Sequence, residues 1–171
     1  MTAAARPADK RCVRPMGQAT ATPPPAPPGR CPASPDRPPE LPRAAVTFPD
    51  ATSARDGGAK PVAIDVEIAA APDETARGLM YRTHMAEDQG MLFRLGERAD
   101  HTFWMRNTCI PLDMMFIEDD GTIVGIAEGV PTLSDATTSV GCPSTHVLEV
   151  NAGWSRRHGV APGQKVSLPP R

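Results

Sequence analysis

The sequence has no apolar run of the roughly 18 residues that a membrane-spanning helix needs, so no transmembrane helix is expected. It has no excess of positive charge either, since 18 Lys and Arg stand against 20 Asp and Glu. A domain that binds nucleic acid through bulk charge is therefore not expected. The four cysteines are too few for a disulfide-dense miniprotein, and their spacing is not that of a zinc finger.

Proline, by contrast, is abundant, and it divides the chain into two unlike parts. Residues 1–60 hold 13 of the 21 prolines and one aromatic residue, with nine basic residues against five acidic ones. Residues 61–171 hold six aromatic residues, including both tryptophans, with nine basic residues against fifteen acidic ones. We therefore predict a disordered, proline-rich tail or tether over residues 1–60 and a single β-rich domain over residues 61–171.

The tail carries no regular pattern of apolar residues. Ten of the 23 residues from Thr20 to Pro42 are proline, which lacks an amide hydrogen, so solvated polyproline II is expected there. The basic residues from Lys10 to Arg14 are not followed by the apolar core of a secretory signal. No export signal is therefore expected in the sequence as written.

Alternating apolar residues predict six or seven strands in the second part. Val62–Ile68 alternates strictly between branched apolar and other residues, which is typical of a strand with one wet face. Further strands are expected over 91–95, 102–105, 112–117, 122–128, 147–150 and 165–168, and short helices over 71–80 and 153–158. The predicted fold class is α+β and β-rich: a compact antiparallel sheet or partly closed barrel with two short helices.

Hydrogen-bonding side chains are concentrated between residues 103 and 113. Asp113 shares a strand face with Met115 and Ile117, and a buried carboxylate needs a partner, for which Arg82 and Arg106 are candidates. We predict a cluster at one rim of the sheet that binds a small polar or anionic ligand or partner, formed by Arg82, Trp104, Arg106, Asn107, Thr108 and Asp113. The alternative is a polar network that only holds the connection together.

Five short motifs resemble those of the domain-of-unknown-function 192 family, in the same order, over roughly residues 62–168. They are Arg77-Gly78-Leu79-Met80-Tyr81-Arg82, Gly90-Met91-Leu92-Phe93, Phe103-Trp104-Met105-Arg106-Asn107-Thr108, Ile110-Pro111-Leu112-Asp113 and Val147-Leu148-Glu149-Val150. The resemblance implies a small β-rich α+β fold without an assigned activity. It also implies a periplasmic, extracellular or envelope-associated bacterial protein.

Cys109 and Cys142 are the two cysteines of the predicted domain. A disulfide between them would close a loop of about 34 residues and stabilise the fold by about 3–4 kcal/mol. Two independent thiols, or a reactive or metal-binding pair, are the alternatives. Cys12 and Cys31 lie in the predicted tail and are expected to be unpaired.

His101, Met105 and Cys109 recur every four residues, and their imidazole and sulfur groups would suit copper. Such spacing aligns side chains only on a helix, whereas residues 102–105 have the composition of a strand. Methionine also fills irregular cores. We therefore predict no metal and no cofactor.

No catalytic triad, nucleophile elbow or glycine-rich phosphate loop is present in the sequence, so enzymatic activity stays open. One alternative function is a small hydrolase that uses Asp113 together with Arg82. Another is a structural module that binds a partner through an exposed apolar patch and takes no ligand. The sequence does not indicate an oligomeric state.

Overall fold

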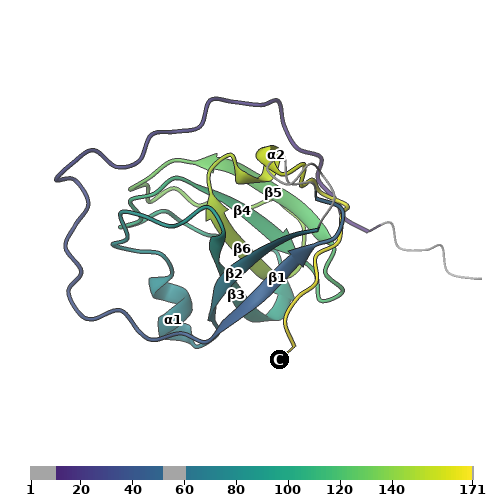
Figure 1. Cartoon of the computed structure of the whole chain (residues 1–171), viewed down its shortest axis with the longest axis horizontal. Coiled ribbons are helices and arrows are strands. Elements are labelled where there is room, and N and C mark those ends of the chain that lie inside the picture. The colour runs from purple at the N-terminus through teal and green to yellow at the C-terminus, as the bar shows by residue number, and fades with distance from the viewer. Residues whose placement is uncertain (1–10, 52–60, 171) are drawn as a thin grey trace, which may run out of the picture.

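The computed structural model describes residues 11–51 and 61–170, and its six strands form one open, mixed sheet (Figure 1). The elements are β1 (Arg43–Phe48), β2 (Val62–Ala69), α1 (Pro72–Arg77), β3 (Gln89–Ala99), β4 (Leu112–Ile117), β5 (Ile123–Val130), β6 (Ser144–Asn151) and α2 (Trp154–Arg157). The spatial order is β1-β2-β3-β6-β4-β5. The predicted fold class is confirmed, although the sheet is not closed into a barrel.

One strand pair departs from the predicted antiparallel sheet. β2 and β3 run parallel, whereas the other four neighbouring pairs are antiparallel. The connection between β2 and β3 contains α1, which carries the chain back across the sheet, as a parallel pair requires. No helix among the described residues is long and apolar enough to cross a membrane.

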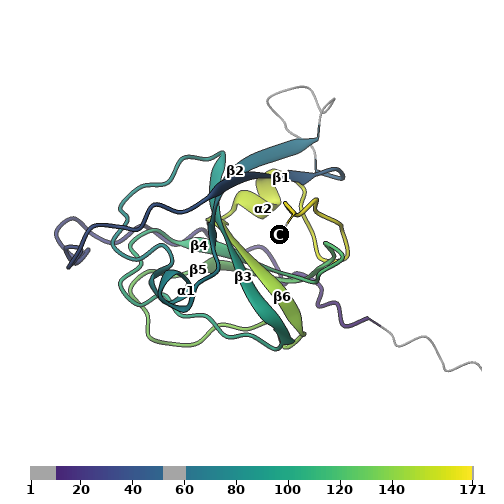
Figure 2. The ribbon, with the colours of Figure 1, turned by 90° about the horizontal axis from the view of Figure 1, so that it is seen from below.

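The sheet buries both of its faces. On the face covered by α1, called the α1 face below, the buried side chains include Met91, Phe93, Met114, Phe116 and Val147. On the face covered by α2, the α2 face, they include Leu92, Met115, Leu148, Val150 and Trp154. The side chains of successive strand residues therefore point to opposite faces of the sheet. The two helices lie on opposite sides of the sheet (Figure 2).

The predicted disordered tail contains a strand, so that prediction is wrong for Arg43–Phe48. β1 pairs with β2 in antiparallel register, from Arg43 opposite Glu67 to Phe48 opposite Val62. Val46 and Phe48 are buried in the core of the α2 face. The burial of these two side chains offsets the entropic cost of ordering a segment that is surrounded by prolines.

Residues 11–42 have no helix or strand, but they run around the outside of the domain as a strap (Figure 1). The amide of Arg14 donates to the carbonyl of Val124 at 2.8 Å, and the amide of Ala26 donates to the carbonyl of Cys109 at 2.9 Å. Arg156 donates to the carbonyl of Gly17 at 2.7 Å. The strap is therefore attached to the domain at several points.

Two disulfides fix this strap, and both correct the predicted pairing. Cys12 is bonded to Cys142, and Cys31 is bonded to Cys109. The expected bond between Cys109 and Cys142 is therefore wrong, as is the expectation that Cys12 and Cys31 are unpaired. Disulfides persist in oxidising compartments, so the two bonds are consistent with an extracytoplasmic location.

Candidate functional site

The predicted polar cluster does not form a single site, because Asp113 lies on the α2 face. It is fully buried, and its carboxylate accepts hydrogen bonds from the amides of Gly129, Gly153 and Ser155 at 2.9–3.0 Å. Its partners are thus main-chain amides and not an arginine. These bonds hold the start of α2 and the end of β5 against β4.

The two arginines of the cluster are occupied by acidic residues of the chain. Arg82 pairs with Glu67 of β2. Arg106 pairs with Asp135 at 2.7 Å, and its guanidinium lies 3.9 Å from the centre of the Trp104 ring. Both arginines are thus paired within the chain, and Arg82 lines a second pocket, of about 300 Å³, together with its partner Glu67.

Asn107 connects two loops instead of facing a ligand. Its backbone is left-handed, with φ of 55°, a conformation that asparagine tolerates better than most residues. Its side-chain amide donates to the hydroxyl of Tyr81 at 3.1 Å. Its main-chain carbonyl accepts from the main-chain amide of Tyr81 at 2.8 Å. These two bonds attach the 100–111 connection to the segment that follows α1.

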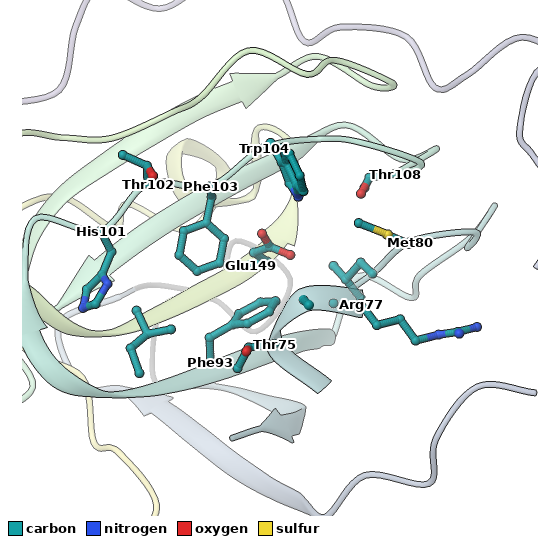
Figure 3. A pocket seen from close by; sticks show the side chains of 14 residues that line it. Thr75, Arg77, Met80, Phe93, His101, Thr102, Phe103, Trp104, Thr108 and Glu149 are labelled. Carbon is teal, nitrogen blue, oxygen red and sulfur yellow. The ribbon is translucent and has the colours of Figure 1, made fainter. Parts of the chain in front are cut away.

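The remaining two members of the cluster, Trp104 and Thr108, line a pocket on the α1 face with a volume of about 280 Å³. Its walls come from α1 and the residues after it, from β3, from the 100–111 connection and from β6 (Figure 3). The apolar part of the lining includes Leu79, Met80, Phe93, Leu95 and Phe103.

The predicted strand over 102–105 does not form, and Phe103 and Trp104 of this segment line the pocket. Only Phe103 pairs like a strand residue, in a bridge whose two hydrogen bonds join it to Thr138 at 2.9 and 2.6 Å. The Phe103 ring packs edge-to-face against Phe93, with 5.1 Å between ring centres. Trp104 stays 41% exposed at the rim.

The pocket also depends on Gly78, where α1 ends. The sequence predicts a helix through Met80, but α1 stops at Arg77, and Gly78 adopts φ of 48° and ψ of −133°. A Cβ atom at this position would lie 3.1 Å from the ring of Phe93. A glycine is required here for its backbone conformation and for the close approach of the aromatic wall.

The carboxyl group in this pocket is that of Glu149, which the sequence analysis did not single out as a site residue. Glu149 is 4% exposed, and its carboxyl has no hydrogen-bond or ion-pair partner among the described residues. Burial raises its pKa from 4.5 to about 8. Figure 3 shows the carboxyl directed into the pocket, with the indole nitrogen of Trp104 turned toward it.

The strand β6 explains how an acid reaches this position. Along Ser144–Asn151, Val147 and Glu149 face the α1 side, whereas Leu148 and Val150 face the α2 side. The neighbouring strands place Met91 and Met114 opposite Glu149. The acid is thus surrounded by apolar side chains except where the pocket opens. The sequence signal was an isolated acid in an otherwise apolar strand.

The residues weighed for copper are placed differently from a metal site. Met105 is buried in the core of the α1 face, and Cys109 is held in its disulfide. His101 lines the pocket, and its Nε2 lies 2.9 Å from the carbonyl of Glu97. Within residues 11–51 and 61–170, no three His, Cys, Asp or Glu side chains gather as metal ligands.

Comparison with known proteins finds a family and two solved structures. The family model described as DUF192, Uncharacterized ACR, matches residues 52–168. A putative transcription regulator from Sinorhizobium meliloti 1021 is 40% identical, with a TM-score of 0.67 over 74% of this chain and 94% of that one. A protein of unknown function from Novosphingobium aromaticivorans DSM 12444 is 33% identical, with a TM-score of 0.65 over 74% and 85%. None of the curated proteins matches the chain.

Proposed function

The chain belongs to the DUF192 family, and on this premise we propose that it is a ligand-binding domain whose pocket on the α1 face holds a small organic molecule. The carboxyl group of Glu149 and the exposed ring of Trp104 would make the principal contacts. This keeps the ligand-binding function predicted from the sequence and centres it on a different acid.

The unpartnered carboxyl of Glu149 carries the proposal. Burying a polar group without a hydrogen-bond partner costs on the order of 1–3 kcal/mol in proteins. Asp113, the other buried acid of the sheet, shows the structural solution, since three amides satisfy it. Glu149 has no such partners and faces an open pocket, as expected of a group whose partner arrives with a ligand.

The motifs that carry the family resemblance support the same pocket. Four of the five contribute lining residues, although they come from different elements of the fold. These residues are Arg77, Gly78, Leu79, Met80, Phe93, Phe103, Trp104, Thr108 and Glu149. Most of the motifs that carry the resemblance thus also contribute to the pocket lining.

The two residues of the hydrolase alternative, Asp113 and Arg82, are both bound to other groups of the chain. Asp113 is buried on the α2 face with main-chain partners, and Arg82 pairs with Glu67. Among the described residues, Glu149 is the one carboxyl group in the pocket lining, so a pair of acids for general acid–base hydrolysis is missing there. Ligand binding is therefore favoured over hydrolysis.

A partner-binding module without a ligand is also less well supported. In the described part of the chain, the large apolar side chains that are strongly exposed are Val13, Trp104 and Leu133. Three such residues are few for an apolar docking patch. Trp104, moreover, is already part of the pocket.

The description of the Sinorhizobium meliloti protein does not lead us to propose transcription regulation here. The two helices in the described ranges, α1 and α2, have six and four residues. Helices of this length are too short for a helix-turn-helix reader of the major groove. We infer instead a domain that works in an oxidising compartment such as the periplasm, because two disulfides hold its strap.

The two tryptophans allow a direct test by NMR with a fragment library. Trp104 lines the pocket, whereas the buried indole of Trp154 donates to the carbonyl of Glu87 at 3.0 Å on the α2 face. Binding fragments should shift the indole signal of Trp104 and leave that of Trp154 in place. A library in which no fragment shifts Trp104 selectively would contradict the proposal.

Two substitutions sharpen this test. Glu149→Gln should weaken the binding of the fragments that shift the Trp104 signal, because it removes the carboxyl group while keeping the size of the side chain. Glu97→Gln is the matched control, since Glu97 is an exposed acid of β3 outside the pocket lining. Equal effects of the two substitutions would mean that Glu149 does not contact the ligand.

A further inference from the structure

We propose that the ligand of this pocket carries a positively charged ammonium group, bound between the carboxylate of Glu149 and the surrounding aromatic side chains. The inference rests on the proposed function and adds the charge of the ligand. It replaces the anionic ligand that the arginines of the predicted cluster suggested.

The charge distribution around the pocket is the first argument. Arg77 is the arginine of the pocket lining, but its guanidinium binds Asp36 and the hydroxyl of Ser34 in the strap. Figure 3 shows this guanidinium pointing away from Glu149. Among residues 11–51 and 61–170, the acid therefore has no cationic side chain as a partner, and a cationic ligand would supply one.

The composition of the walls is the second argument. Phe93, Phe103 and Trp104 all line the pocket, and Met80 adds a polarizable thioether. Aromatic rings attract an ammonium ion through their negative faces, and the attraction reaches about 2 kcal/mol or more where water is excluded. An acid among several aromatic rings favours a cation over an anion, which both the rings and the carboxylate would repel.

The position of the acid is the third argument. Glu149 lies at the buried end of the pocket, while Trp104 stands at its rim, 41% exposed. An ammonium group would thus enter past the tryptophan and come to rest against the acid. The volume of about 280 Å³ admits a compact cation with a short apolar body.

The inference also predicts the direction in which the affinity for a cation changes with pH, which can be measured. The empty pocket holds Glu149 mostly protonated below pH 8, since burial raises its pKa to about 8. A cation binds the ionised form, so its affinity should rise with pH. The other titratable lining residues are Arg77 of α1 and His101 of the 100–111 connection, and β3 and β4 place only Met91 and Met114 opposite the acid.

Three small molecules with the same branched skeleton and different charges provide the probes. They are choline, its neutral analogue 3,3-dimethyl-1-butanol, and the anion 3,3-dimethylbutanoate. Kd would be measured for each by saturation-transfer NMR titration of the full chain at pH 6 and pH 9, with propylammonium as a second cation. We expect both cations to bind more tightly at pH 9 by about tenfold or more, and the alcohol to change less than about threefold.

The variants separate the acid from the rest of the pocket. Glu149→Gln should remove the pH dependence of choline binding and its advantage over the alcohol, while binding of the alcohol persists. Glu97→Gln should leave the Kd of every probe unchanged. If the Glu149→Gln variant still binds the alcohol, it is also shown to be folded.

The outcomes distinguish this inference from the proposed function. If library fragments shift Trp104 but neither cation binds at pH 9, the cationic ligand is wrong and the ligand-binding function stands. Cation affinity that falls from pH 6 to pH 9 would also overturn the inference, because Glu149 would then act as a protonated donor. If neither fragments nor probes bind, both proposals fail.

Discussion

Cys31 of the strap is disulfide-bonded to Cys109, the residue that directly follows the pocket-lining Thr108. The same segment is held a second time, because the amide of Ala26 donates to the carbonyl of Cys109. A proline-rich stretch that could not fold alone is thus fixed next to the candidate site. The strap also supplies the partners of Arg77, so it orients a residue of the pocket lining.

Removing this bond with the double substitution Cys31→Ser and Cys109→Ser should destabilise the domain by about 4 kcal/mol, since the bond closes a loop with a sequence separation of 78. Urea unfolding of the oxidised proteins would measure the loss. Peptide mapping without reductant should recover the links 12–142 and 31–109 in the native chain. A 109–142 link would contradict the pairing described here.

Asp113 gives a second test, on the opposite face of the sheet. Asp113→Asn should cost about 2–4 kcal/mol of stability, because an amide cannot accept all three main-chain hydrogen bonds that the carboxylate accepts. Asp135→Asn is the control: it breaks only the exposed pair with Arg106, which is worth up to about 1 kcal/mol. Urea unfolding compares the two variants. Similar losses would show that the buried acid has no special structural role.

Strands with a strong apolar pattern were predictable from the sequence. β4 has the predicted bounds, Leu112–Ile117, and alternation correctly placed Asp113 with Met115 and Ile117. β1 was missed because only its last residues, around Val46 and Phe48, alternate, and the prolines nearby indicated a tether. It is ordered by its pairing with β2, the next strand of the chain, and local pattern alone does not reveal such pairing.

The candidate site was predictable in part. Trp104 and Thr108 do line a pocket, but the acid in that pocket is Glu149 and not Asp113. Both acids lie in apolar strands, and the sequence does not tell which face opens to a cavity and which meets main-chain amides. The disulfides show the same limit, since four cysteines allow three connectivities.

The end of α1 can be tested with a pair of glycine substitutions. Gly78 has φ of 48° and lies against Phe93, whereas Gly96 has φ of 75° and open space around it. Gly96→Ala should cost about 1 kcal/mol through backbone conformation alone. Gly78→Ala should cost about 1–2 kcal/mol more, because the new methyl group crowds the ring. It should also weaken fragment binding, since Phe93 forms a wall of the pocket. Equal losses of stability for Gly78→Ala and Gly96→Ala in urea unfolding would mean that the ring of Phe93 moves aside and that the contact costs nothing.

Glu149 should make the protein less stable as the pH rises, which is opposite to the usual effect of a paired acid. Its pKa is 4.5 when unfolded and about 8 when folded, so the folded state binds the extra proton between these values. Stability should therefore fall from about pH 5 to pH 8, by on the order of 3–5 kcal/mol, and level off above pH 8.

Glu149→Gln removes this titration while filling the same space. In urea unfolding at pH 5, 6.5, 8 and 9 without ligand, the variant should gain stability relative to the native chain as the pH rises. Glu97→Gln should follow the native curve, because Glu97 is an exposed acid outside the pocket lining. Parallel curves for the native chain and Glu149→Gln would show that Glu149 is already ionised at neutral pH. In that case the pocket would have to supply a partner for the carboxylate even when it is empty, and the argument for a cationic ligand would lose its basis.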